Sequence, residues 1–134
     1  YETLVEDLLL DNNVHFVGKV PNNNVPDYIN KMDIFVVPSR EIESFGVAAV
    51  EAMACGVPVI VTNVGGLPEV VLNGKTGIVV PPNNQNELVK AIEFLINNKE
   101  LREEFGDRGV IHVKENYDWN INADNMIKFY ENIE

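Results

Sequence analysis

Two glutamates in one short segment, Glu43 and Glu51, have side chains that can accept hydrogen bonds from hydroxyl groups. The residues between them lead into the small, apolar run 47–55, which has the composition of a helix packed inside a domain. An ionised carboxylate in apolar surroundings costs several kcal/mol unless hydrogen bonds satisfy it. Glu51 therefore predicts a ligand that carries hydroxyl groups.

The start of that predicted helix has the properties of an anion site. A helix that begins near Gly46 offers free backbone N–H groups and the positive end of its dipole to a phosphate. Glu51 lies five residues further on, or roughly 7 Å along the axis at about 1.5 Å per residue. This is about the separation between the diphosphate of a nucleotide and its ribose hydroxyls. Glu43, just before the helix, is placed to accept hydrogen bonds from a sugar joined to the diphosphate.

The sequence predicts strands that alternate with helices, and these elements must position the segment that contains Glu43 and Glu51. β-Branched runs predict strands buried on both faces at 14–17, 34–37, 59–61 and 78–80. Helices are expected at 27–31, 46–55, 67–72, 85–97, 100–113 and 121–133, and Asn84 with Glu87 resembles a capping box. The alternation predicts an α/β fold, a Rossmann-like three-layer α/β/α arrangement with a mainly parallel sheet. Ligands bind such sheets at the carboxyl ends of the strands, here the loops 18–24, 38–46 and 62–67.

Length, charge and cysteine content narrow the class of protein. The 134 residues suit a single domain, 1–134, whose last helices occupy 100–134. A net charge of −11 repels nucleic acid, so no nucleic-acid partner is expected. One cysteine, Cys55, indicates a reducing compartment, taken as the cytoplasm. No apolar run approaches the roughly 20 residues of a membrane span. The start at Tyr1 indicates a piece of a longer protein, whose membrane association stays open.

The motif segment also resembles a known family. Pro38-Ser39, then Glu43 to Gly46, then Glu51 through Val59 is similar to the E-x7-E signature of retaining GT-B glycosyltransferases of the "glycosyl transferases group 1", or family 4, type. Segments 16–20, 65–71 and 73–81 and the helix that contains Trp119 fall where this family has similar segments. The resemblance covers nearly the whole chain in register and implies one half of a GT-B fold.

The resemblance implies a role for each motif residue. Glu43 would contact hydroxyl groups of the donor sugar, as the catalytic-site residue, and Glu51 would hold the nucleotide ribose. The diphosphate would be received by the backbone amides of Ser44, Phe45, Gly46 and Val47. Contacts to the base or from neighbouring loops are expected at Gly18, Lys19, Val20, Ser39, Gly65 and Gly66.

The same resemblance implies an activity and its requirements. The full-length protein would be a hexosyltransferase-type enzyme that transfers a sugar from a nucleotide-diphosphate sugar, with UDP or GDP, to an acceptor with retention. Neither a cofactor nor a metal is implied, and the sequence contains no D-x-D pair. In the family, a glycine-rich turn with an Arg and a Lys, and an entire N-terminal acceptor domain, precede this region. We therefore expect a donor-binding domain that is incomplete at its N-terminus and inactive alone.

Other interpretations stay open from the residues themselves. A non-catalytic Rossmann-like or flavodoxin-like regulatory module is one alternative, although the acidic cluster such a module carries after its first strand is absent, and a sugar-nucleotide epimerase of related GT-B fold is another. Gly65 and Gly66 are equally consistent with a tight strand-to-helix connection. Cys55 is expected to be a buried packing residue, His112 to lie on the surface far from the loops, and Tyr117 with Trp119 to anchor the final helix.

Overall fold

The computed structural model describes residues 1–131. Its elements, in chain order, are α1 (Glu2–Asp7), η1 (Asn22–Asn24), α2 (Val25–Ile29), β1 (Phe35–Val37), α3 (Val47–Ala54), β2 (Val59–Thr62), α4 (Leu67–Val70), β3 (Gly77–Val80), α5 (Gln85–Ile96), α6 (Lys99–Asn116) and α7 (Trp119–Glu131). The helices expected from the sequence are confirmed to within a few residues, and α1 was not expected. The predicted end of the last helix, beyond residue 131, lies outside the described residues.

The described strands form one parallel sheet. Their order is β1-β2-β3, so β2 is central, and Ile60 of β2 is in register with Val36 of β1 and Ile78 of β3. Every residue of β2 is buried, as expected for a strand covered on both faces. The parallel α/β sheet predicted from the alternation of strands and helices is confirmed.

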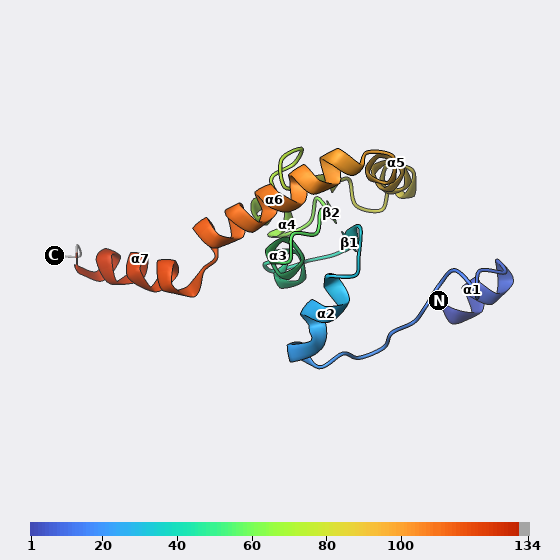
Figure 1. Ribbon diagram of the computed structural model, residues 1–134, viewed down its shortest axis with the longest axis horizontal. Helices are drawn as coiled ribbons and strands as arrows, with labels where there is room; N and C mark the ends of the chain where they lie inside the picture. Colours follow the sequence, from blue (N-terminus) through green and yellow to red (C-terminus); the bar gives the residue numbers. More distant parts are fainter. Residues whose placement is uncertain (132–134) are drawn as a thin grey trace.

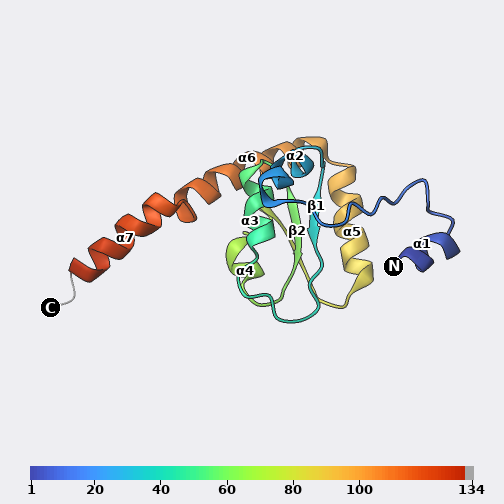
Figure 2. The same cartoon turned by 90° about the horizontal axis from the view of Figure 1, so that it is seen from below.

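Two apolar clusters cover the two faces of the sheet. Val59 and Val61 of β2 face the cluster built with α3 and α4, whereas Ile60 faces the cluster built with α5 and the first half of α6. Figure 2 shows α3 and α4 on one side of the strands and α5 on the other. The alternation of side chains along β2 therefore produces the three-layer α/β/α arrangement.

Helix α6 joins the two layers. Phe105, near its middle, is 2% exposed in the cluster under α5, and Val113, two turns later, packs against the cluster under α3. Helix α7 continues away from the sheet, as Figure 1 shows, and all of its described residues are exposed. Trp119, at 88% exposure, does not anchor this helix, contrary to the sequence prediction. Within residues 1–131 the ring belongs to neither apolar cluster.

The strand predicted at 14–17 is wrong. Residues 14–20 belong to no helix or strand, and Phe16 and Val17 are 48% and 47% exposed. Figure 1 shows this part of the chain as an extended segment that runs away from the sheet towards α1. A β-branched run becomes a buried strand only beside a partner strand, and the described residues place none next to it.

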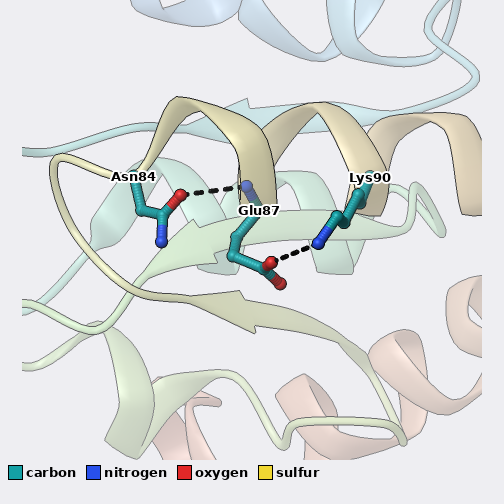
Figure 3. Close-up of polar contacts among 3 residues, drawn as sticks. All are labelled: Asn84, Glu87 and Lys90. Carbon is teal, nitrogen blue, oxygen red and sulfur yellow. Dashed lines mark hydrogen bonds and ion pairs between the residues drawn. The ribbon is translucent and has the colours of Figure 1, made fainter.

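The predicted capping box at α5 is half formed. The Asn84 side-chain oxygen accepts a hydrogen bond from the Glu87 amide at 3.1 Å, which is the N-cap contact. The Glu87 carboxylate pairs with Lys90 at 2.7 Å instead of reaching back to the Asn84 amide (Figure 3). An i,i+3 cation on the exposed helix face thus takes the carboxylate from its capping partner.

Candidate functional site

Helix α3 begins with free backbone donors. Its N-cap is Gly46, which adopts the left-handed region at φ 87°, and the Gly46 carbonyl accepts from the amides of Ala49 and Val50 at 2.9 and 3.2 Å. Among the described residues, the five amides from residue 44 to residue 48 have no acceptor. Consecutive unpaired N–H groups at the positive end of a helix form an environment that favours an anion.

Gly46 is required at this position for two reasons. Its φ lies in the region that L side chains rarely adopt, and a Cβ built there would lie 2.6 Å from a methyl carbon of Leu67, a fully buried residue of α4. The entrance of α3 therefore packs directly against the first turn of α4.

Helix α3 is buried on one face only, which corrects the expectation of a helix packed on all sides. Ala49, Ala52 and Met53 face the core with no exposed surface. The opposite face is formed by exposed residues, namely Val47, Ala48, Glu51 and Ala54. Spacings of three and four residues place these side chains together. Glu51 is thus a solvent-accessible carboxylate that water can satisfy, so the expectation that it lies in apolar surroundings and needs a ligand's hydroxyl groups for that reason is wrong. The side chains around it are small, and a ligand can approach the helix closely there.

The loop of residues 38–46, here called the motif loop, is held by the connection between β2 and α4. The Thr62 hydroxyl donates to the Ser39 carbonyl at 2.7 Å, and the Gly66 amide donates to the Glu43 carbonyl at 3.0 Å. Thr62 is 4% exposed, so its hydrogen bond is shielded from water. Sequence analysis missed Thr62, although a threonine that ends the otherwise aliphatic strand β2 is a usable signal.

Gly65 explains why this connection is rich in glycine. It has φ +52°, and a Cβ at Gly65 would lie 1.8 Å from the Glu43 carbonyl oxygen. At Gly66 a Cβ would lie 2.7 Å from the Ser44 carbonyl oxygen. The backbone of the β2–α4 connection thus rests on the backbone of the motif loop. The tight strand-to-helix connection considered from sequence is present, and its tightness serves the contact with Glu43 and Ser44.

The side chains of Glu43 and Phe45, both in the motif loop, are at least partly exposed to solvent. Glu43 is half-buried, and its carboxylate forms no hydrogen bond or ion pair with the described residues. Phe45 is 44% exposed and packs edge-on against Tyr117, with ring centroids 5.5 Å apart. Tyr117 lies at the end of α6, so an element distant in sequence contacts the motif loop.

A hollow of about 700 Å³ opens at the carboxyl ends of the strands. It is lined by residues that follow all three strands, with the first turn of α5 and part of α1, namely Tyr1, Leu4, Pro38, Arg40, Thr62, Pro81, Asn83, Asn84, Gln85 and Leu88. Its position agrees with the rule for ligand sites in parallel α/β sheets. Its lining includes Pro38 and Arg40 of the motif loop but neither Glu43 nor Glu51, so the hollow does not contain the α3 entrance.

Gly18, Lys19 and Val20 lie away from the motif loop. They belong to the extended segment before η1, and no hydrogen bond joins them to the motif loop within residues 1–131. The structure brings together residues 39, 43–47, 51 and 65–66, and it does not bring residues 18–20 to them.

Two side chains near α3 have raised pKa values. Burial, and secondarily the Glu51 carboxylate, raises the pKa of the Cys55 thiol, so the thiolate that a nucleophile requires is disfavoured. Burial, and secondarily Glu69, raises the pKa of the Tyr117 hydroxyl. Cys55 is partly exposed but packs against the α3 cluster, in line with a packing role.

Within residues 1–131, no three His, Cys, Asp or Glu side chains come together as a metal site would require. No helix in this range has both the length and the apolar composition needed to cross a bilayer.

Comparison with known proteins agrees with this geometry. The model of the family "Glycosyl transferases group 1" matches residues 1–110. An uncharacterised glycosyltransferase of Methanocaldococcus jannaschii is 39% identical over 132 residues, which cover 96% of this chain and 37% of that protein. The chain spans about a third of the length of the curated relatives it matches.

Solved structures show the same architecture. Sucrose-phosphate synthase from Thermosynechococcus elongatus superposes with a TM-score of 0.89 at 36% identity, covering 97% of this chain and 32% of that one. The HepE protein of Anabaena in complex with UDP superposes with a TM-score of 0.88 at 26% identity, covering 97% of this chain and 35% of that one. HepE has also been solved in complex with UDP-glucose.

Fold and site together define a Rossmann-like α/β layer with a helix entrance suited to an anion at the carboxyl edge of its sheet. The chain belongs to the glycosyl transferases group 1 family, whose members among its relatives and structural neighbours are GT-B glycosyltransferases.

Proposed function

We propose that this chain binds the nucleotide-diphosphate sugar donor of a retaining, metal-independent glycosyltransferase. One observation carries the proposal: five consecutive amides with no acceptor among residues 1–131 stand at the entrance of α3, and the exposed Glu51 follows on the same helix. The amides of residues 44–47 would receive the diphosphate, and Glu51 the ribose hydroxyls. The UDP and UDP-glucose complexes of HepE support a donor of this class.

We assign the other residues of the motif loop and its surroundings by their position relative to the amides that would receive the diphosphate. Glu43 precedes the amides and has a carboxylate without a protein partner, so we assign it the hydroxyl groups of the donor sugar. Thr62 holds the motif loop at Ser39, and Gly65 and Gly66 hold it at Glu43 and Ser44. Residues 18–20 would lie beside the base only if the segment before η1 changes position.

Catalysis itself requires more than the described residues. Arg40 is the one cation within the motif loop, and it forms no ion pair with the described residues. A diphosphate in a chain of net charge −11 needs further positive charge, which in the proposed enzyme comes from a region not included in this sequence. The acceptor would be bound by a second domain. We therefore propose that the chain alone does not transfer sugar, and the single cysteine makes the cytoplasm the proposed location.

The test is nucleotide binding by Glu51→Gln. Uridine, guanosine and adenosine diphosphates are titrated into the chain and followed by backbone amide NMR shifts. We expect dissociation constants on the order of 1 mM, with shifts concentrated at residues 44–47. Glu51→Gln removes the charge while keeping the size, and it should weaken binding several-fold because charge-assisted hydrogen bonds are replaced by neutral ones.

Two matched controls accompany this variant. Glu41→Gln alters an exposed glutamate of the motif loop, and Glu93→Gln alters an exposed helical glutamate of α5 on the other face of the sheet. Both should bind like the parent. Shifts that avoid residues 44–47, or equal losses in Glu51→Gln and Glu41→Gln, would contradict the assignment.

A further inference from the structure

A column of three rings reaches the motif loop from the end of α6. Tyr117 packs edge-on against Phe45 and also edge-on against His112, with 5.5 Å between ring centroids in each pair. The interplanar angles of 80° and 83° are the T-shaped geometry in which aromatic rings attract one another. Tyr117 is half-buried and also packs against the α3 cluster.

His112 is fixed at the base of this column, in contrast to the surface role expected from sequence. Its Nε2 lies 3.1 Å from the Val70 carbonyl oxygen, which can only accept, so Nε2 carries the proton and donates. The Asn116 amide nitrogen donates to the His112 carbonyl at 2.8 Å and lies 3.1 Å from His112 Nδ1. A flipped amide would set two oxygens against each other, so Nδ1 accepts. Both ring nitrogens therefore hold the imidazole in one orientation and one tautomer.

Helix α4 contacts both the ring column and the motif loop. Val70 is the last residue of α4, and the Gly66 amide, immediately before α4, donates to the Glu43 carbonyl. The motif loop is thus fixed at Glu43 by the start of α4 and at Phe45 by the ring column based on its end. The amides of residues 44–48, which have no acceptor among the described residues, begin directly after Glu43 and include that of Phe45.

We propose that Tyr117, braced by His112, is a positioning residue for the motif loop and holds Phe45 so that the amides of residues 44–47 face a single ligand. The last clause rests on the proposed function; the positioning of the loop does not. Tyr117 acts through its ring, since edge-to-face contacts with Phe45 and His112 need no hydroxyl.

The experiment compares Tyr117→Leu with Tyr117→Phe in the 134-residue chain. Amide shifts of residues 44–47 and hydrogen exchange of the Gly66 amide are recorded first without ligand, and UDP is then titrated. Tyr117→Leu should move the loop amides, speed Gly66 exchange about threefold to tenfold and weaken UDP binding by a similar factor. Tyr117→Phe keeps the ring and should match the parent in all three measurements. Trp119→Leu, which alters an exposed ring two residues away, is the matched control and should leave the loop unchanged.

Two further variants separate positioning from a general loss of packing. Phe45→Leu alters a partly exposed ring and should reproduce the loop changes of Tyr117→Leu, and the double variant should be no worse than either single variant. His112→Leu should act in the same direction more weakly. His112→Gln should recover part of the loss, because its amide can donate to the Val70 carbonyl.

The outcomes separate this inference from the proposed function. Unchanged loop amides in ligand-free Tyr117→Leu, or additive effects of the Tyr117 and Phe45 variants, would overturn the positioning role whatever UDP does. Loop amides that respond as expected in a parent chain that binds none of the uridine, guanosine and adenosine diphosphates would confirm the positioning role and refute the proposed function. A loop that responds together with weakened UDP binding would support both.

Discussion

The motif loop and the segment of residues 11–20 both belong to the region that matches the family, yet among the described residues only the motif loop is tied to distant parts of the chain by hydrogen bonds and a ring contact. The motif loop is held by Thr62 from β2, by Gly66 before α4 and by Tyr117 after α6. Residues 14–17 have the β-branched composition of a buried strand, and Phe16 nevertheless remains 48% exposed. The difference lies in the neighbours and not in the composition.

This contrast teaches what a strand-forming sequence needs. β1 is bonded to β2 on one side only, and among the described residues no strand occupies its other side. Its three residues are accordingly only partly buried, whereas β2, with partners on both sides, is fully buried. A strand sequence far from such an edge gains neither ladder hydrogen bonds nor burial, so it remains extended and exposed.

The largest expected difference in unfolding free energy is between variants of two phenylalanines, one in the core and one in the segment 11–20. Phe105→Ala removes a ring that is 2% exposed, and it should lower the free energy of unfolding by about 3–5 kcal/mol because it leaves a cavity under α5. Phe16→Ala, in the unpacked segment, should change it by less than about 1 kcal/mol. Urea denaturation of the two variants measures both values. Similar losses would mean that residues 11–20 are packed in solution.

The second comparison uses two glycines with positive φ. Gly65→Ala adds strain at φ +52° and drives a Cβ into the Glu43 carbonyl, so we expect a loss of about 2–4 kcal/mol and displaced motif-loop amides. Gly18 has φ +72°, and a Cβ built there has no heavy atom within 4 Å. Because the surrounding segment can relax, Gly18→Ala should lower the free energy of unfolding by no more than about 1 kcal/mol. Denaturation together with NMR shifts distinguishes them. Equal effects would remove the evidence that the β2–α4 connection supports the motif loop.

Thr62→Val tests a single hydrogen bond beneath the motif loop. The substitution keeps the shape of the side chain but leaves the Ser39 carbonyl without its donor, which should cost about 1–2 kcal/mol of unfolding free energy. Thr3→Val, on the exposed helix α1, is the control and should be neutral. A neutral Thr62→Val would show that water replaces the hydroxyl at Ser39.

The smallest effect concerns Cys55. Its raised pKa means that alkylation by iodoacetamide should require a higher pH than for a free cysteine, whose pKa is about 8.5. Glu51→Gln removes the secondary cause, lowers the pKa and should speed alkylation about twofold near pH 8, while burial keeps the reaction slow. Glu93→Gln should have no effect. A rate that is unchanged in Glu51→Gln would mean that the Glu51 carboxylate does not act on the thiol.

Local sequence determined most of the fold described here. Periodicity placed the three observed strands and the helices near them, because β-branched runs bounded by turns and the apolar stripe of α5 need only short-range information. The motif spacing placed Gly46 at the entrance of α3 and Glu51 on the same helix, because helix geometry is fixed within a few residues. Asn84 was recognised as an N-cap for the same reason.

Only the tertiary structure decided which of these features are packed and what supports the site. The carbonyls of Ser39 and Glu43 are bonded by residues more than twenty positions away, and Phe45 meets Tyr117 from a distant helix. The exposed face of α3 and the unpaired segment 14–17 likewise depend on which neighbours are present. Burial and long-range hydrogen bonds are properties of pairs of segments, so the composition of either segment alone does not specify them.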